Sequence, residues 1–248
     1  KSFQWTTDVM FYANKESIES LYNGKVDDIG NKWFIGHPIN VHYDYEKIGI
    51  WQNTSEDLAE MEEFNKNGAN FKSGDIKIWD NGDKKITEAD RKILGSTSPK
   101  FIASMVNSIS YKGFDFSIFL YASVGAMLNN NIEYLNKPGR ANSIVIDYWT
   151  PTNPTNAYPR PSVDNASPAY VKSLQYEKAD FIRVRNITLG YTLPEKLLKK
   201  IRARKIRVYL SANNPFVITG FSGIDPEGAR GYTAPSASTW MGGVNLSF

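Results

Sequence analysis

The pattern of hydrophobic and polar residues predicts six β-strands, because apolar and polar side chains alternate in six separate segments, least regularly in residues 101–111. In the clearest segment, residues 114–124, Phe, Ile, Leu, Ala and Val at even positions alternate with Asp, Ser, Phe and Tyr at odd positions. The predicted strands span residues 3–13, 101–111, 114–124, 186–193, 206–213 and 240–248. The longest of them have about 9 to 11 residues, the length at which a tilted strand crosses a bilayer.

The terminal segment, residues 240–248, ends on an aromatic residue. Trp240, Val244, Leu246 and Phe248 share its apolar face. Because an unpaired apolar edge strand promotes aggregation, we expect this strand to have neighbours on both sides. A closed barrel provides such neighbours, so these four residues predict a barrel strand. The Ser, Thr, Asn and Gly faces opposite the apolar faces suit a polar lumen.

The connections between the predicted strands alternate between long and short. Residues 14–100, 126–180 and 219–238 form the long connections, and Lys112-Gly113 and residues 194–205 form the short ones. In outer-membrane barrels the short turns are periplasmic and the long loops are extracellular. We therefore expect an all-β, transmembrane antiparallel β-barrel fold with three extracellular loops and a periplasmic C-terminus.

Six strands are too few to close a membrane barrel, since the smallest such barrels have eight. Either further strands lie within the long connections, or the remaining strands of the barrel wall lie outside residues 1–248. The segments 33–35, 40–45 and 48–52 are candidates within the first connection. The Gly, Pro and charged residues around them favour a folded external loop over lipid-facing strands.

Composition narrows the function classes. Aromatic residues make up 13% of the chain, which suits a membrane barrel, but a soluble carbohydrate-binding β-sandwich would share this feature. No run of 18 apolar residues predicts a transmembrane helix, and the absence of cysteine excludes disulfides and thiol chemistry. The net charge is only +3, and the basic run Lys199–Arg207 has no interleaved aromatic residues, so we expect no nucleic-acid partner.

A series of short motifs runs in order through nearly the whole chain. The motifs include Lys32–Ile39, Tyr43–Tyr45, Gly49–Gln52, Gly74–Lys77, Asn81–Asp83, Asp90-Arg91, Tyr111–Asp115, Tyr148–Pro154, Phe181–Tyr191 and Ala212–Phe216. Their succession resembles the SusC/RagA-type TonB-dependent transporters of the Gram-negative outer membrane. The resemblance implies that residues 1–248 are the C-terminal part of a large, plugged barrel of the 22-stranded class.

The same resemblance implies partners and a role. In this family the remaining barrel strands and the plug, which contacts TonB, lie N-terminal to the matched region, and outer-membrane lipid surrounds the wall. A SusD-like surface lipoprotein closes over the barrel mouth and captures oligosaccharide or peptide. No catalytic motif is present in the sequence. We therefore expect a non-enzymatic part of a nutrient importer that requires no cofactor.

The acidic stretch between Asp80 and Asp90 resembles a calcium loop, with Asp80, Asn81, Asp83 and Asp90 as the candidate ligands. The match has two departures. One residue is missing between Asp80 and Asn81, and Lys84 occupies the position at which glycine makes the sharp turn. A solvated turn followed by a short helix is the alternative interpretation.

Aromatic residues in the two longest connections are candidates for contact with substrate or with a protein lid, because rigid aromatic faces suit both. These residues are Trp33, Tyr43, Tyr45, Trp51, Tyr148, Trp149 and Tyr170. Packing of the loops upon themselves is the alternative interpretation for each of them.

Overall fold

The computed structural model describes residues 3–130, 145–161, 168–199, 203–227 and 236–248 of the chain. The chain folds into two compact units. The first unit comprises Lys1–Lys15, Ser98–Ala126 and Lys178–Phe248, and the second comprises Glu16–Thr97 and Met127–Glu177. Within the described ranges, no helix is both long enough and apolar enough to cross a membrane.

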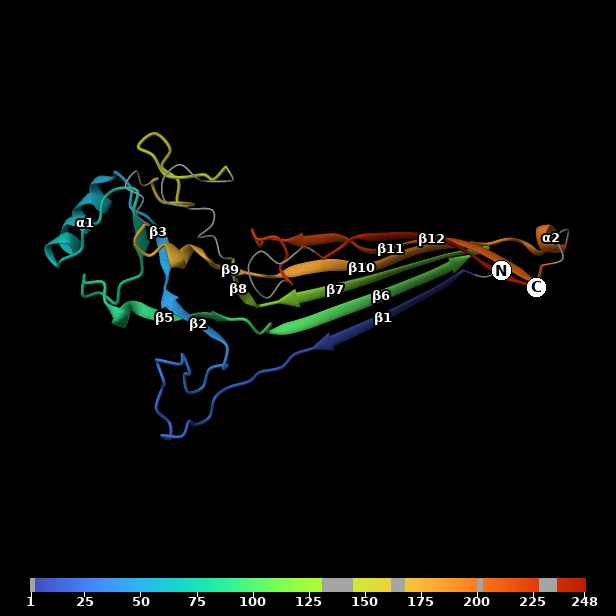
Figure 1. The fold of residues 1–248 in the computed structure, drawn as a ribbon, viewed down its shortest axis with the longest axis horizontal. Helices are drawn as coiled ribbons and strands as arrows, with labels where there is room; N and C mark the ends of the chain where they lie inside the picture. Colours follow the sequence, from blue (N-terminus) through green and yellow to red (C-terminus); the bar gives the residue numbers. More distant parts are fainter. Residues whose placement is uncertain (1–2, 131–144, 162–167, 200–202, 228–235) are drawn as a thin grey trace. The chain divides into compact units, whose positions relative to one another are not determined.

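The first unit is one antiparallel sheet of six long strands (Figure 1). The strands lie in the sheet in the order β1 (Gln4–Tyr12), β6 (Phe101–Tyr111), β7 (Phe114–Val124), β10 (Phe181–Thr192), β11 (Lys205–Thr219) and β12 (Thr239–Ser247). All six predicted strands are therefore present. Each long strand pairs with the long strand that precedes or follows it along the chain, and β1 and β12 form the edges.

The pairing register places side chains of like polarity next to one another across the sheet. One row consists of Trp5, Ile109, Phe116, Leu189 and Leu210. The adjacent row, on the opposite face, consists of Thr6, Ser108, Ser117, Thr188 and Ser211. On the apolar face, Leu189 is 52% and Leu210 is 54% exposed. The sheet thus has one apolar and one polar face, as the alternation predicts.

Hydrogen bonds between neighbouring strands stabilise the polar face. Asn186 Nδ2 donates to Asn213 Oδ1 at 2.7 Å and to Ser211 Oγ at 3.1 Å. Thr188 Oγ1 lies 2.7 Å from Ser211 Oγ. The short polar side chains of β10 and β11 therefore satisfy one another across the strand pair.

An ion pair on the polar face spans three strands. Arg207 of β11 donates from Nε to Asp115 Oδ1 of β7 at 2.9 Å. Gly190 of β10 lies between them and pairs with Asp115 on one side. A Cβ atom at Gly190 would lie 2.4 Å from Arg207 Nη2 and 2.6 Å from Asp115 Oδ2. The missing side chain is therefore what lets the ion pair cross the middle strand.

The two short connections of the sheet have different structures. Lys112 and Gly113 join β6 to β7 with φ angles of 49° and 93°. Positive φ at both central residues is typical of the type I′ turn, whose twist matches that of the flanking strands. The connection from β10 to β11 contains the short helix α2 (Glu195–Leu198). Residues 200–202 of the basic run lie outside the described residues.

Two strands extend beyond their predicted limits. β10 begins at Phe181 and β11 ends at Thr219. A register shift between Val184 and Asn186 marks a β-bulge, and Asn214 on the facing strand has a φ of 48°. An extra residue in one strand changes which face the following side chains occupy, so the two-residue alternation is interrupted there.

The second unit, Glu16–Thr97 and Met127–Glu177, contains most of the residues of the two longest connections. Its strand pairs are β2 (Val41–Tyr45) with β5 (Arg91–Ser96), β3 (Lys47–Ile50) with β4 (Ile76–Ile78), and β8 (Met127–Asn129) with β9 (Tyr176–Lys178). Among its described residues, the helices are α1 (Ser55–Lys66), η1 (Glu88–Asp90) and η3 (Val171–Leu174). The strand candidates 40–45 and 48–52 within the first connection therefore correspond to β2 and β3 of the small sheets, whereas 33–35 forms only isolated bridges, from Trp33 to Asp28 and from Ile35 to Ile18.

Local signals account for helix α1. The side chain of Thr54, the N-cap residue, accepts a hydrogen bond from Asp57 N at 3.2 Å. Glu56 and Asp57 place negative charge in the first turn, where the helix dipole favours it. Met61 and Phe64, three residues apart, are the buried residues of the helix.

The Arg207–Asp115 ion pair passes over Gly190, so a side chain at this position should destabilise the sheet. We expect Gly190→Ala to destabilise the sheet by about 1–3 kcal/mol, because the new methyl group must displace Arg207 or Asp115. The measurement is the temperature at which the intact protein loses its folded mobility in semi-native gel electrophoresis. Gly220→Ala is the control, since a Cβ there meets no atom within 4 Å. Equal melting temperatures for the two variants would contradict the prediction.

Candidate functional site

Two apolar cores stabilise the second unit. Ile50, Ile76, Ile78, Trp149 and Leu174 form the first core, and Trp51, Met61, Phe64 and Phe71 form the second. Trp51 is 1% and Trp149 is 5% exposed. Two of the aromatic residues considered for substrate or partner contact therefore lie in cores. The alternative interpretation, packing of the loops upon themselves, accounts for both.

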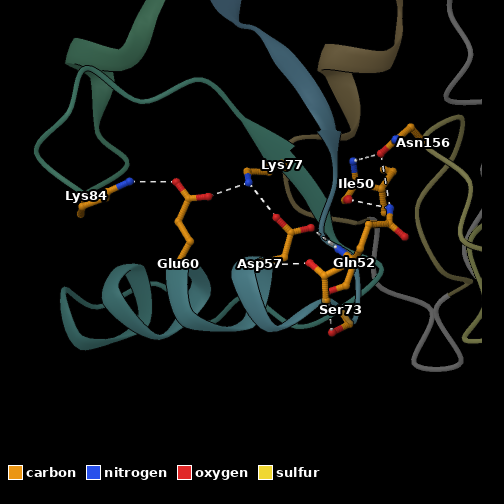
Figure 2. A network of polar contacts seen from close by, with 9 residues as sticks. Ile50, Gln52, Asp57, Glu60, Ser73, Lys77, Lys84 and Asn156 are labelled. Atoms are coloured by element: carbon orange, nitrogen blue, oxygen red, sulfur yellow. Dashed lines mark hydrogen bonds and ion pairs between the residues drawn. The ribbon is translucent and has the colours of Figure 1, made fainter.

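Specific polar contacts join the two connections that form the second unit. Asn156 Oδ1 accepts from Ile50 N at 2.9 Å (Figure 2), and Trp149 Nε1 donates to Gln52 Oε1 at 2.8 Å. Gln52 Nε2 in turn donates to Ile50 O at 2.7 Å. Because buried polar groups are costly without partners, these bonds favour one relative placement of the two connections.

Lys77 is the centre of a charge network beside helix α1 (Figure 2). Its Nζ lies 2.9 Å from Asp57 Oδ1, 2.6 Å from Glu60 Oε2 and 4.1 Å from the centre of the Trp51 ring. Lys84 Nζ lies 2.8 Å from the other oxygen of Glu60. Burial opposes the charge of Glu60, but Lys77 and Lys84 outweigh it and hold the pKa of this carboxyl below its ordinary value.

A cavity of about 660 Å³ lies within the second unit. Tyr43, Tyr45 and Tyr170 line it, so the structure brings together three of the seven aromatic candidates. The rings of Tyr45 and Tyr170 meet edge to face with their centroids 5.1 Å apart. Burial raises the pKa of Tyr170 above its ordinary value. Trp33 and Tyr148 are not among the lining residues.

Charged residues outside the set of predicted site residues also line this cavity. They are Lys32, Asp44, Glu88, Arg91 and Lys172. Arg91 begins β5 and pairs with Tyr45 of β2, and its guanidinium carbon lies 5.1 Å from the centre of the Tyr45 ring. This pairing joins two segments that are far apart in the sequence. The sequence contains the motif Asp90-Arg91 but gives no signal of what it faces.

The candidate calcium ligands converge in space. Asp80, Asp83 and Asp90 each contribute a carboxylate oxygen, and these oxygens lie within 4.8 Å of one another. Asp90 is fully buried and accepts hydrogen bonds from Asn81 N at 3.0 Å and from Thr87 N at 2.6 Å. Asn81 directs its side-chain oxygen to Asp83 N at 3.0 Å.

Two further features describe this acidic turn. Asp80 Oδ1 is buried and has no hydrogen-bond partner among the described residues. Lys84, at the glycine position of a calcium loop, has a φ of 58°, so its backbone adopts the left-handed conformation while its ammonium contacts Glu60. The turn and the short helix η1 of the alternative interpretation are both present. Calcium binding stays a prediction.

A buried ion pair fixes the start of the connection between β11 and β12 to the sheet. Arg183 is 2% exposed, and its Nη2 lies 2.5 Å from Asp225 Oδ1. Glu227 contacts both Arg183 and Arg185. Burial opposes the charge of Asp225, but the N–H groups of Glu227 and Ser236 and the charge of Arg183 hold its pKa below the ordinary value. Residues 228–235 of this connection lie outside the described residues.

Comparison with known proteins identifies relatives over the whole chain, although no protein-family model matches it. TonB-dependent receptor P3 of Formosa agariphila is 31% identical, and the match covers 92% of this chain and 23% of the receptor. TonB-dependent receptor SusC of Bacteroides thetaiotaomicron is 27% identical over 100% of this chain and 25% of the receptor. The chain is similar over its whole length to the SusC/RagA-type TonB-dependent transporters.

Solved structures agree with this family. The RagAB peptide importer in its open-open state matches with a TM-score of 0.74 at 25% identity, over 100% of this chain and 27% of that chain. The predicted all-β, barrel-type fold is therefore confirmed, and the open sheet corresponds to part of a barrel wall. The chain spans about a quarter of the length of the SusC/RagA relatives it matches.

The network around Lys77 predicts a large effect of one substitution. We expect Lys77→Met to lower the free energy of unfolding of the second unit by about 2–3 kcal/mol, because it leaves two partly buried carboxylates without their shared cation. Lys66→Met is the control, because Lys66 also pairs with a carboxylate of α1: its pair with Glu62 is 69% exposed on both sides, and the expected change is below about 0.5 kcal/mol. Protease susceptibility in the intact protein measures both changes, and similar effects would contradict the prediction.

The acidic turn predicts an effect of calcium. We expect calcium to slow proteolysis between residues 80 and 90, because the ion would bind the converging carboxylates and the unpaired Asp80 Oδ1. Asp83→Asn should abolish this protection, whereas Glu88→Gln, an exposed carboxylate outside the cluster, should retain it. Calorimetric titration with calcium after chelation measures the binding itself. Unchanged proteolysis of the wild-type protein in millimolar calcium would exclude the site.

Proposed function

We propose that this chain forms part of the wall and the outer loops of a nutrient importer in the Gram-negative outer membrane. The observation that carries the proposal is the six-stranded sheet, whose matched register gives one continuous apolar face and one polar face. The named relatives, TonB-dependent receptors and a peptide importer, support the same conclusion.

The two faces of the sheet define the role of the wall. The apolar face, with Trp240 at 62% and Leu246 at 58% exposure, is placed against lipid. The polar face is placed towards the lumen, where its short hydroxyl and amide side chains face the plug. A soluble β-sandwich would bury its large apolar side chains against a second sheet, so their exposure favours the membrane wall over that alternative.

The second unit is placed outside the cell, together with the connection 219–238. Its own cores and polar network give it a defined shape, so it can form a fixed rim at the barrel entrance. We propose that this rim contacts a SusD-like lipoprotein and that TonB acts through the plug, which lies elsewhere in the transporter. Oligosaccharide and peptide both remain candidate substrates, and the chain contributes no catalytic chemistry.

The proposed topology can be tested because the chain contains no cysteine. Lys66 on α1 and Lys196 on α2 are both exposed lysines on helices, and the proposal places them on opposite sides of the membrane. In intact cells, a membrane-impermeant maleimide should label Lys66→Cys at least tenfold faster than Lys196→Cys. The experiment uses the full-length protein with no other cysteine.

Permeabilisation of the outer membrane provides the internal control for this experiment. It should equalise the labelling of the two variants, which shows that both thiols are reactive in the folded protein. Equal labelling in intact cells, or recovery of the protein in the soluble fraction without detergent, would overturn the proposal.

A further inference from the structure

The tyrosine-lined cavity of the second unit has the dimensions of a ligand site. Its volume of about 660 Å³ lies within the range of about 300–1,000 Å³ that is common for small-molecule sites. All of its lining residues belong to the second unit. The cavity is therefore a feature of one compact body.

One wall of the cavity is aromatic and held in place. Tyr45 and Tyr170 meet edge to face, and Tyr170 has φ 60° and ψ 20°, a left-handed conformation that is uncommon for a residue with a side chain. The buried Ser173 donates from Oγ to Tyr170 O at 2.7 Å and supports this conformation. Lys32, also in the lining, has a φ of 60°. Strained backbone of this kind concentrates at functional sites.

The other distinctive feature of the cavity is Arg91. Its Nε is buried and has no hydrogen-bond partner among the described residues. Its Nη1 lies 3.2 Å from Glu88, but the Glu88 side chain is 83% exposed, so water competes for this pair. An arginine fork binds carboxylates with paired hydrogen bonds, and a buried donor without an acceptor favours such a ligand.

The remaining charges favour an anionic ligand. Lys32 and Lys172 add two positive charges to the lining. The negative charges come from Glu88 and from Asp44, and Asp44 is already engaged: Oδ2 accepts from Tyr176 Oη at 2.8 Å and Oδ1 from Tyr45 N at 2.9 Å. The cations of the lining therefore exceed the acids.

We propose that this cavity binds a ligand in which a carboxylate is attached to a CH-rich body. Arg91 binds the carboxylate, and the rings of Tyr45 and Tyr170 pack against the body. A uronic-acid oligosaccharide and the C-terminal end of a peptide both have this chemistry. The proposal deepens the proposed function, because it assigns a substrate class to the outer rim, but the binding itself is measured without transport.

Calorimetric titration of the purified full-length protein tests the proposal, with an oligogalacturonate trisaccharide and a tripeptide with a free carboxyl terminus as probes. We expect at least one of the two to bind, and its neutral counterpart, the methyl-esterified trisaccharide or the amidated tripeptide, to bind at least tenfold more weakly. The probe that binds identifies the source of the carboxylate. Absence of binding by both probes, or equal binding of the neutral counterparts, would overturn the proposal.

Variants connect the binding to Arg91. Arg91→Gln should weaken binding of the carboxylate probe at least tenfold, and Arg91→Lys should lose part of the affinity because it keeps the charge but not the fork. Lys85→Gln removes an exposed lysine outside the lining and should bind as the wild type does. Protease resistance equal to that of the wild type verifies the fold of each variant. Undiminished binding by folded Arg91→Gln would contradict the assignment.

The calorimetric experiment and the cysteine-labelling experiment can fail independently of each other. Failure of the cysteine-labelling experiment would remove the membrane topology and leave the calorimetric result intact. Absence of binding with the expected labelling pattern would remove the ligand site and leave the importer wall.

Discussion

The rest of the structure depends on the two-residue alternation shared by all six long strands. A shift of one residue in any strand pair would move every apolar side chain of that strand to the polar face. Two independent features oppose such a shift. The two-residue turn at Lys112-Gly113 fixes the register of β6 on β7, and the ion pair between Asp115 and Arg207 ties β7 to β11 across β10. The turn at Lys112-Gly113, the strand pairing and the Asp115–Arg207 ion pair thus specify one register for these strands.

The sheet was predictable where this alternation is uninterrupted. The segments 101–111 and 114–124 coincide with β6 and β7, because a glycine turn separates them and the alternation of 114–124 is regular, although that of 101–111 is the least regular of the six. The start of β10, before Asn186, and the end of β11, after Asn213, were not predictable, since the bulge and the left-handed Asn214 interrupt the two-residue period. The pairing of β2 with β5 could not be predicted from the sequence either, because it depends on tertiary contacts between short strands that are far apart in the chain.

The loop aromatics show a different limit of sequence reasoning. Periodicity gives no means to separate Trp51 and Trp149 from Tyr45 and Tyr170, because all four lie in irregular connections. In the structure the two tryptophans are core residues, and the two tyrosines border a cavity. Tyrosine suits a boundary, since its ring packs while its hydroxyl requires a polar neighbour. Burial here follows from which segments fold together, and local sequence does not encode that.

The acidic turn and the cavity belong to one local structure. Asp90 accepts from two backbone N–H groups and closes the capping box with Thr87 that begins η1. Arg91 follows as the C-cap, and its N–H donates to Glu88 O. The most buried carboxylate of the calcium candidate is therefore already used to place the arginine that lines the cavity. A substitution of Asp90 would alter both features together, whereas Asp83, which is exposed, separates metal binding from the position of Arg91.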